Sequence, residues 1–271
     1  EFFFKKLTNI RRYITYILYS TLLILGKKTM RLIIFLILFF ISMHVHAGQK
    51  LSYSFNNEMF EGYLSQPETK SKGLIIVIHD WDGLTEYEET RANMLSSLGY
   101  TAFAVDLYGK GNRPKEINLR KAETKKLYEN RKRMRALILA GINQVNKNNI
   151  KTFIMGYCFG GSAALELARS GNGKNIVGYA SFHGGVKTPE GQSYSSNTKP
   201  IFIAHGGADK AVKLDDVFGV TKELEQNKIF YEVNIYAGAP HAFTVFKSKR
   251  YRKNADEKSW ESFLSFVDKT M

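Results

Sequence analysis

One stretch decides the fold: residues 156–161, GYCFGG, which hold Cys158, the single cysteine of the 271-residue chain. Residues 151–155 before it (KTFIM) are apolar and partly β-branched, as in a buried strand, and residues 162–169 after it (SAALELAR) favour a helix. A strand, a glycine-framed tight turn and a helix form the setting of a nucleophile elbow. The helix N-terminus favours thiolate over thiol. We therefore expect Cys158 to be a nucleophile, and a buried structural cysteine is the alternative.

An acid and a histidine follow Cys158 along the chain, each after a predicted strand. Residues 200–205 (PIFIAH) read as a buried strand that runs into Asp209, and residues 229–236 alternate as a strand that leads to His241. The order nucleophile, acid, base is that of an α/β-hydrolase. His241 would take or hold the thiol proton, while Asp209 would fix its tautomer and stabilise the imidazolium. Taken singly, Asp209 could cap a helix and His241 could be a surface histidine.

A second part of the site is expected after an earlier strand. Residues 73–78 (GLIIVI) are strongly apolar and end in residues 79–83 (HDWDG). In a hydrolase of this kind, backbone N–H groups after the nucleophile and after an early strand stabilise the developing oxyanion. Trp81 and Phe159 are therefore the expected donor pair. The alternative is that the Trp81 side chain is part of the core or of a pocket wall.

These residues resemble the dienelactone hydrolase family. The resemblance is carried by residues 156–161 with Asp209 and His241, and by residues 99–108 (GYTAFAVDLY), which end in the family's Asp-Leu-Tyr. It extends from about residue 73 to the C-terminus. It implies an α/β-hydrolase fold, a mostly parallel doubly wound sheet flanked by helices, without a large lid. It also implies attack of the cysteine on the carbonyl of an ester or lactone, followed by water.

The resemblance extends to single residues of the site. In the family, a glutamate after the early strand contacts the resting thiol and helps to ionise it, and Asp80 occupies that position here. Tyr108 is a candidate for the pocket wall. The type enzyme holds its substrate's carboxylate with an arginine four residues after the histidine, where this chain has Val245. We therefore expect a neutral or less acidic ester as substrate, unless Arg91 or Lys247 replaces the missing group.

Two other histidines follow or end predicted strands. His183 and His205 could each line the pocket, and a structural role in the core or a loop is the alternative. Neither belongs to a metal-ligand motif such as H-E-x-x-H, and residues 156–161 lack the G-x-G-x-x-G of a dinucleotide site. We therefore expect no metal and no cofactor.

Composition fits one sizeable catalytic domain, with 44% hydrophobic residues. The formal net charge is +14, and much of it lies in residues 120–147. That segment predicts one amphipathic helix whose Lys and Arg side chains face solvent. Its apolar face comprises Met134, Leu137, Ile138, Gly141 and Val145. No basic motif interleaved with aromatic residues occurs, so we expect no nucleic-acid binding.

Strands and helices alternate along the rest of the chain, as in a mostly parallel sheet. Residues 51–55 and 60–64 predict a leading antiparallel hairpin. A later helix is expected to bury Val217, Phe218 and Leu224 on one face.

The N-terminus predicts export. Met30 and Arg31 precede a short apolar run, residues 32–43, and Ala47 follows as the small residue at a cleavage site. Such a run is too short to span a bilayer comfortably. A positive start, a short apolar run and a small residue are typical of a secretory signal peptide.

The expected organisation has two parts. Residues 1–47 would be an N-terminal extension and signal peptide, with Met30 as the start, and residues 48–271 a single α/β-hydrolase domain, exported to the periplasm or secreted as a monomer. Residues 13–25 form a second apolar run, so an N-terminal membrane anchor is the alternative.

The sequence thus predicts an exported, cofactor-free hydrolase of small esters or lactones. Acyl transfer or thioester cleavage through the same acyl-Cys158 is the rival reaction. A binding protein that keeps the fold without turnover is the rival class. A redox-sensing role for Cys158 has weak support, because the chain has no second cysteine to resolve an oxidised thiol.

Overall fold

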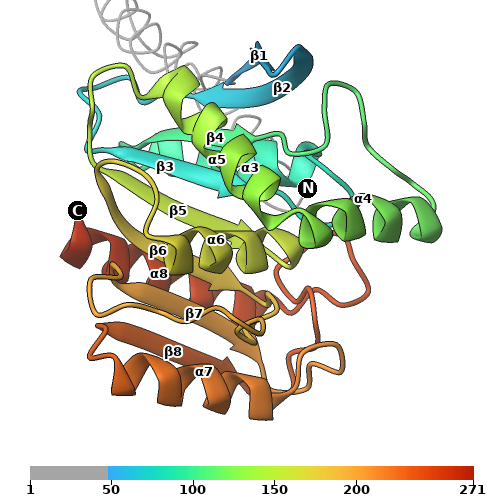
Figure 1. The fold of residues 1–271 in the computed structure, drawn as a ribbon, viewed down its shortest axis with the longest axis vertical. Helices are drawn as coiled ribbons and strands as arrows, with labels where there is room; N and C mark the ends of the chain where they lie inside the picture. The colour runs from blue at the N-terminus through green and yellow to red at the C-terminus, as the bar shows by residue number, and fades with distance from the viewer. Residues whose placement is uncertain (1–47) are drawn as a thin grey trace, which may run out of the picture. The chain divides into compact units, whose positions relative to one another are not determined.

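A mixed sheet organises residues 48–271, the part of the chain that the computed structural model describes (Figure 1). Within these residues the sheet has eight strands in the order β1-β2-β4-β3-β5-β6-β7-β8. The strands are β1 (Gln49–Phe55), β2 (Glu58–Ser65), β3 (Leu74–Ile78), β4 (Thr101–Val105), β5 (Thr152–Tyr157), β6 (Ile176–Phe182), β7 (Ile201–Gly206) and β8 (Tyr231–Tyr236). The helices are α3 (Glu86–Ser97), α4 (Ile117–Glu129), α5 (Arg131–Val145), α6 (Phe159–Ser170), α7 (Leu214–Gln226) and α8 (Lys253–Thr270).

The strands from β4 to β8 run parallel, and the hairpin β1–β2 joins them antiparallel through β4. Asn56 and Asn57 between β1 and β2 have φ of 49° and 63°. Positive φ at both central residues is typical of the two-residue hairpin turns whose twist matches that of the strands. The expected mostly parallel sheet flanked by helices is confirmed.

The sheet is buried on both faces, which explains why its central strands are apolar throughout. In β3 the side chains alternate between two hydrophobic clusters: Ile76 and Ile78 belong to one, Ile75 and Val77 to the other. The first cluster includes residues of α5, α6 and α7, and the second includes residues of α3 and α8. The carboxyl ends of the parallel strands thus meet at one edge of a rigid, two-sided core.

The basic segment from residue 120 to residue 147 is not one helix, as the sequence predicted. Helices α4 and α5 meet at Asn130, whose φ of −121° and ψ of 68° lie outside the helical region. The Asn130 side chain accepts a hydrogen bond from the Arg133 backbone N–H at 3.0 Å. Asparagine is a favoured N-cap, so this cap starts α5 anew and breaks the continuous pattern. Met134 and Leu137 of α5 are buried as expected.

Helix α7 also differs from the expected pattern. Phe218 is 58% exposed, and Val220 takes its place beside Val217 and Leu224 on the buried face. The core therefore uses the smaller side chain where α7 meets the sheet.

The predicted extension, signal peptide and membrane anchor all fall in residues 1–47, which lie outside the described residues. In the described part of the chain, every helix is too short or too polar to cross a bilayer.

Candidate active site

Cys158 stands in a sharp turn between β5 and α6. It has a φ of 51° and a ψ of −110°, a positive-φ conformation that is disfavoured for a residue with a Cβ. Such strain costs about 1–3 kcal/mol and persists where the surroundings enforce it. Here the Cys158 N–H donates to the Phe182 carbonyl at 2.9 Å, and the Cys158 carbonyl accepts from Ser162 N at 3.2 Å. The turn matches the elbow that the sequence predicted.

Two glycines allow α6 to start so close to the sheet. A Cβ built on Gly156 would lie 2.2 Å from the Gly160 carbonyl carbon and oxygen. A Cβ on Gly160 would lie 2.2 Å from the Ile78 carbonyl oxygen. Real Cβ atoms do not approach backbone this closely, so glycine is required at both positions.

Cys158, His241 and Asp209 form one chain of hydrogen bonds. His241 Nε2 lies 3.1 Å from Cys158 Sγ, and His241 Nδ1 lies 2.8 Å from Asp209 Oδ2. Asp209 follows β7 and His241 follows β8, so the parallel sheet brings both to the edge where β5 ends. The structure thus brings together the three residues that the sequence singled out.

The Asp209 carboxylate is held by more than His241. It accepts hydrogen bonds from the backbone N–H groups of Ala211 at 2.7 Å and Val212 at 3.0 Å. Burial raises the pKa of Asp209, but the hydrogen bond from His241 and those from the backbone outweigh it and hold the pKa below its usual value. Asp209 is therefore ionised at neutral pH and can orient the imidazole.

Asp80 is a second group that interacts with the thiol. Burial and then the Asp80 carboxylate raise the pKa of the Cys158 thiol well above its usual value, while the Phe159 N–H acts against them. Burial, followed by the charge of Asp82, raises the pKa of Asp80 to about 6. The resting thiol is thus protonated, in contrast to the thiolate that the helix N-terminus and the acid at position 80 led us to expect, because burial and the Asp80 charge oppose ionisation. It has two acceptors beside it, the Asp80 carboxylate and His241 Nε2.

The two expected oxyanion donors are both engaged in this arrangement. The Phe159 N–H interacts with the Cys158 sulfur, and the Trp81 N–H donates to the Asp80 carboxylate. The Trp81 side chain is half-buried, with the Arg120 guanidinium over its ring at 5.5 Å. The Trp81 N–H can donate to a substrate oxyanion only after its hydrogen bond to Asp80 has broken.

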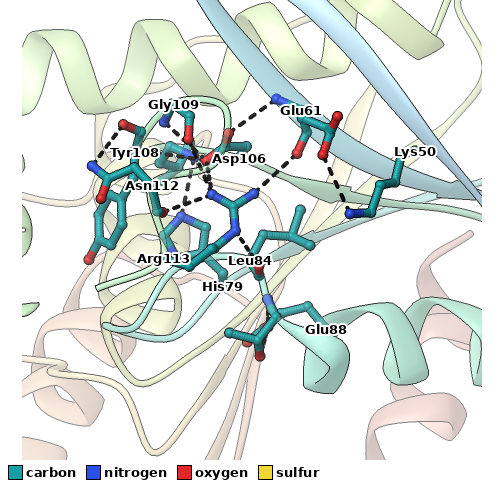
Figure 2. A network of polar contacts seen from close by, with 12 residues as sticks. Lys50, Glu61, His79, Leu84, Glu88, Asp106, Tyr108, Gly109, Asn112 and Arg113 are labelled. Carbon is teal, nitrogen blue, oxygen red and sulfur yellow. Dashed lines mark hydrogen bonds and ion pairs between the residues drawn. The ribbon is translucent and has the colours of Figure 1, made fainter. Parts of the chain in front are cut away.

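A buried polar network fixes the loops that carry Asp80 and Tyr108. Figure 2 shows Asp106 at its centre, where its carboxylate accepts hydrogen bonds from the backbone of Glu61 (3.1 Å) and of Tyr108 (3.0 Å) and pairs with Arg113 at 3.3 Å. The aspartate of the family-like Asp-Leu-Tyr sequence, Asp106, therefore has a structural role.

His79 connects that network to Asp80. Burial lowers the pKa of His79 to about 4, so the ring is neutral. Its Nδ1 lies 2.6 Å from the Asp80 carbonyl and its Nε2 accepts from the Leu107 N–H at 3.2 Å. The loops after β3 and β4 are thus tied together through His79.

The other candidates lie near the site in different roles. The Tyr108 hydroxyl donates to the Trp81 carbonyl at 3.1 Å, and the Tyr108 ring packs near Phe159. His183 is buried and its ring meets that of His241 edge-on, at 5.3 Å between centroids. His205 is buried, and its Nε2 donates to the Val212 carbonyl at 3.2 Å, so it supports the Asp209 loop.

Arg91 is not the substrate-binding group that the sequence left open. It is 1% exposed and pairs with Asp256, so it cannot reach a bound molecule. Lys247 is exposed, and Val245 is half-buried. The sequence did not indicate that Arg91 is buried and paired, because its partner Asp256 is distant in the chain.

The sequence also did not indicate that Tyr128, at the end of α4, lies near the site. Its ring meets Phe159 edge-on at 5.5 Å. Burial and the nearby Cys158 raise its pKa, while Ser162 lowers it. It follows a charged stretch in the sequence, and no motif marks it.

Residues 60–271 match the sequence profile described as the Dienelactone hydrolase family. The chain belongs to this family. The expected resemblance is confirmed, and with it the expected enzyme class, a hydrolase of ester bonds. Within residues 48–271, no three His, Cys, Asp or Glu side chains gather as they would around a metal ion.

Individual proteins are similar to this chain over most of its length. "Protein usf" of Aquifex pyrophilus is 25% identical over 209 residues, which cover 72% of this chain and 87% of the relative. "Probable 2-oxo-3-(5-oxofuran-2-ylidene)propanoate lactonase" of Bradyrhizobium sp is 25% identical over 224 residues, 78% of this chain and 90% of the relative. The solved structure "m3DLH" superimposes with a TM-score of 0.74 at 25% identity, covering 83% of this chain and 98% of that one.

We predict that Gly160→Ala lowers the free energy of unfolding by at least about 2 kcal/mol, because the added Cβ must push α6 away from the β3 backbone. Urea unfolding followed by circular dichroism measures the change. Gly219→Ala is the matched control, since a Cβ there meets nothing within 4 Å on the exposed face of α7. That control should be neutral or more stable by up to about 1 kcal/mol. A Gly160→Ala protein as stable as the parent would contradict the close contact.

Proposed function

We propose that the protein hydrolyses small ester or lactone substrates through an acyl-cysteine intermediate on Cys158, with His241 and Asp209 as the other members of a catalytic triad. The observation that carries the proposal is the hydrogen-bond chain from Cys158 Sγ to His241 Nε2 (3.1 Å) and from His241 Nδ1 to Asp209 (2.8 Å). The match to the dienelactone hydrolase family and the relative named as a lactonase support the substrate class. The enzyme would act as a monomer without metal or cofactor.

In the first half-reaction, the thiol proton passes to His241 and the sulfur attacks the carbonyl carbon. Asp209, ionised and hydrogen-bonded, stabilises the imidazolium that forms. The carbonyl π electrons move to oxygen, and the Phe159 N–H stabilises this oxyanion. When the tetrahedral intermediate collapses, the bond to the alcohol oxygen breaks and His241 returns the proton to that oxygen. The product is a thioester on Cys158 and a free alcohol, which stays attached if the substrate is a lactone.

In the second half-reaction, water attacks the thioester carbonyl while His241 Nε2 takes a proton from it. Collapse releases the carboxylic acid and the Cys158 sulfur, which regains its proton. The same imidazole thus serves as base and acid in both steps, as microscopic reversibility requires.

Asp80 would control when the thiol becomes reactive. As a carboxylate it holds the thiol in its protonated form and also occupies the Trp81 N–H. A substrate carbonyl entering between Asp80 and the sulfur would release both groups together. The thiol would then face His241 alone, and the Trp81 N–H would join that of Phe159 as the second oxyanion donor.

Acyl transfer to an acceptor other than water remains the rival reaction, because it passes through the same acyl-Cys158. Adding an alcohol or thiol during turnover and measuring product partition separates the two. We also propose that residues 30–47 direct export of the enzyme to the periplasm or the medium, on the strength of the charged start, apolar run and Ala47.

The first prediction of this proposal concerns the nucleophile. Cys158→Ala should lower kcat/KM for a p-nitrophenyl ester by several orders of magnitude, because the covalent route is lost. Ser162→Ala, which removes the hydroxyl one turn further along α6, is the matched control and should keep kcat/KM within about tenfold of the parent, roughly 1.4 kcal/mol. Near-parental turnover by Cys158→Ala would overturn the nucleophile assignment.

The second prediction concerns pH. The pKa of Asp80 is raised to about 6, so this carboxyl accepts a proton as the pH falls through that value and can no longer hold the thiol. Ionised Asp80 restrains the thiol and occupies the Trp81 N–H, so its protonation should release both groups. We therefore expect kcat/KM of the parent, divided by that of Asp80→Asn, to rise as the pH falls through about 6, since this parameter reports groups of the free enzyme. Asp80→Glu should retain such a step. A ratio of parent to Asp80→Asn kcat/KM that does not change with pH would contradict this role of Asp80.

The third prediction concerns substrate charge. Val245 supplies no cation, and Arg91 is already paired with Asp256. A carboxylate-bearing lactone should therefore not be favoured over a neutral ester of similar size, and Val245→Arg should shift the ratio of kcat/KM values toward the acid. A tenfold or greater preference of the parent enzyme for the acid, about 1.4 kcal/mol, would refute this expectation.

A further inference from the structure

A buried cation lies behind the segment that carries His241. Arg91 of α3 is 1% exposed and pairs with Asp256 of α8. Its guanidinium lies 4.3–5.5 Å from the centroids of four rings, those of Tyr87, Tyr157, Phe246 and Trp260. A buried charge is tolerated only when it is paired and surrounded by favourable partners. The proposed chemistry makes no direct use of this cation.

The segment after His241 is tied to Arg91 at three points. Arg91 Nη2 donates to the Thr244 carbonyl at 3.0 Å. The Tyr87 hydroxyl accepts from Arg91 Nε at 3.4 Å and lies 2.7 Å from Thr244 Oγ1. Phe246 is one of the four rings around the Arg91 guanidinium. The segment is thus anchored to α3, a helix far away in the sequence.

Thr244 extends this anchor to the base itself. Its hydroxyl lies 2.8 Å from His183 Nε2, and the His183 ring packs edge-on against the ring of His241. Thr244 and His183 are both fully buried. His183 therefore forms a fixed wall behind the imidazole. Burial, and then the charge of His241, lowers the pKa of His183 well below its usual value, so this wall is neutral when His241 is protonated.

The backbone beside His241 needs such support. Ala242 has a φ of 60° and His183 a φ of 43°, both in the left-handed region that residues with a Cβ rarely adopt. Neither conformation is favoured locally. The contacts of Thr244 are among those that hold them in place.

We propose that Thr244, held by Arg91 and Tyr87, is a positioning residue that sets the distance between the His241 imidazole and the Cys158 sulfur. This inference rests on the proposed triad. Proton transfer and attack are sensitive to small displacements of the reacting groups, so loss of the Thr244 hydroxyl should affect turnover more than substrate binding. Thr244 is fully buried and hydrogen-bonds to His183 and Tyr87, so it would act through His183 and the loop backbone.

The test compares three variants of the full chain with p-nitrophenyl butyrate as the probe. Thr244→Val keeps the shape of the side chain and removes the hydroxyl, and Thr244→Ser keeps the hydroxyl. Tyr100→Phe is the matched control, because it removes a different side-chain hydrogen bond, from the Tyr100 hydroxyl to Asp268 of α8 at 2.5 Å, away from the His241 segment. Thermal melting of each variant reports stability alongside kcat and KM.

We expect Thr244→Val to lower kcat at least tenfold with KM changed less than twofold. Thr244→Ser should restore kcat to within threefold of the parent, and Tyr100→Phe should leave it unchanged even where it lowers the melting temperature. If Thr244→Val does not fold, Tyr87→Phe removes one arm of the same anchor and should lower kcat at least threefold, again with KM unchanged.

Two results would overturn the inference. One is a parental kcat in folded Thr244→Val, or in Tyr87→Phe if that variant is used. The other is an equal loss of kcat in Tyr100→Phe, which would make the effect one of general stability. Cys158→Ala is assayed alongside to separate failure of this inference from failure of the proposed triad. An active Cys158→Ala protein would show that the triad proposal itself is wrong.

Discussion

The close contact between the start of α6 and strands β3 and β5 is the constraint on which the site depends. Gly156 and Gly160 let backbone meet backbone, with no room for a side chain between them. Because the helix starts directly at the sheet, the turn before it is forced into the positive-φ conformation of Cys158. The strain places the sulfur above the sheet edge, within reach of loops that follow β3, β7 and β8. The core on both faces of the sheet supplies the rigidity that maintains this strain.

The titratable groups around that sulfur have different pKa values because their surroundings differ. Asp209 receives hydrogen bonds that hold its pKa low, so it stays ionised behind His241. Asp80 is buried with fewer such donors, and its pKa rises to about 6. His183 is kept neutral by burial and backs the imidazole. Under the proposed function the two carboxylates would therefore have different tasks: Asp209 would orient the base, and Asp80 would restrain the nucleophile.

The sequence predicted most of the sheet and the chain from Cys158 to His241 and Asp209, because these rest on one rule: carboxyl ends of parallel strands share an edge. It could not predict features that depend on contacts between distant residues or on local caps. Arg91 and Asp256 are 165 positions apart, and nothing near either residue indicates the pairing. The break at Asn130 depends on one side-chain cap within a continuous helical pattern. The engagement of the Trp81 N–H by Asp80 depends on the orientation of one carboxylate.

The central claim is that substrate carbon becomes covalently attached to Cys158. The most direct measurement is mass spectrometry of the protein quenched in acid during turnover of an activated ester, followed by peptide mapping. The account predicts a mass increase equal to one acyl group, located on the peptide that contains Cys158 and lost on dilution into buffer as hydrolysis proceeds. An acyl group on another residue, or turnover with no acylated protein at any quench time together with direct incorporation of water, would contradict it.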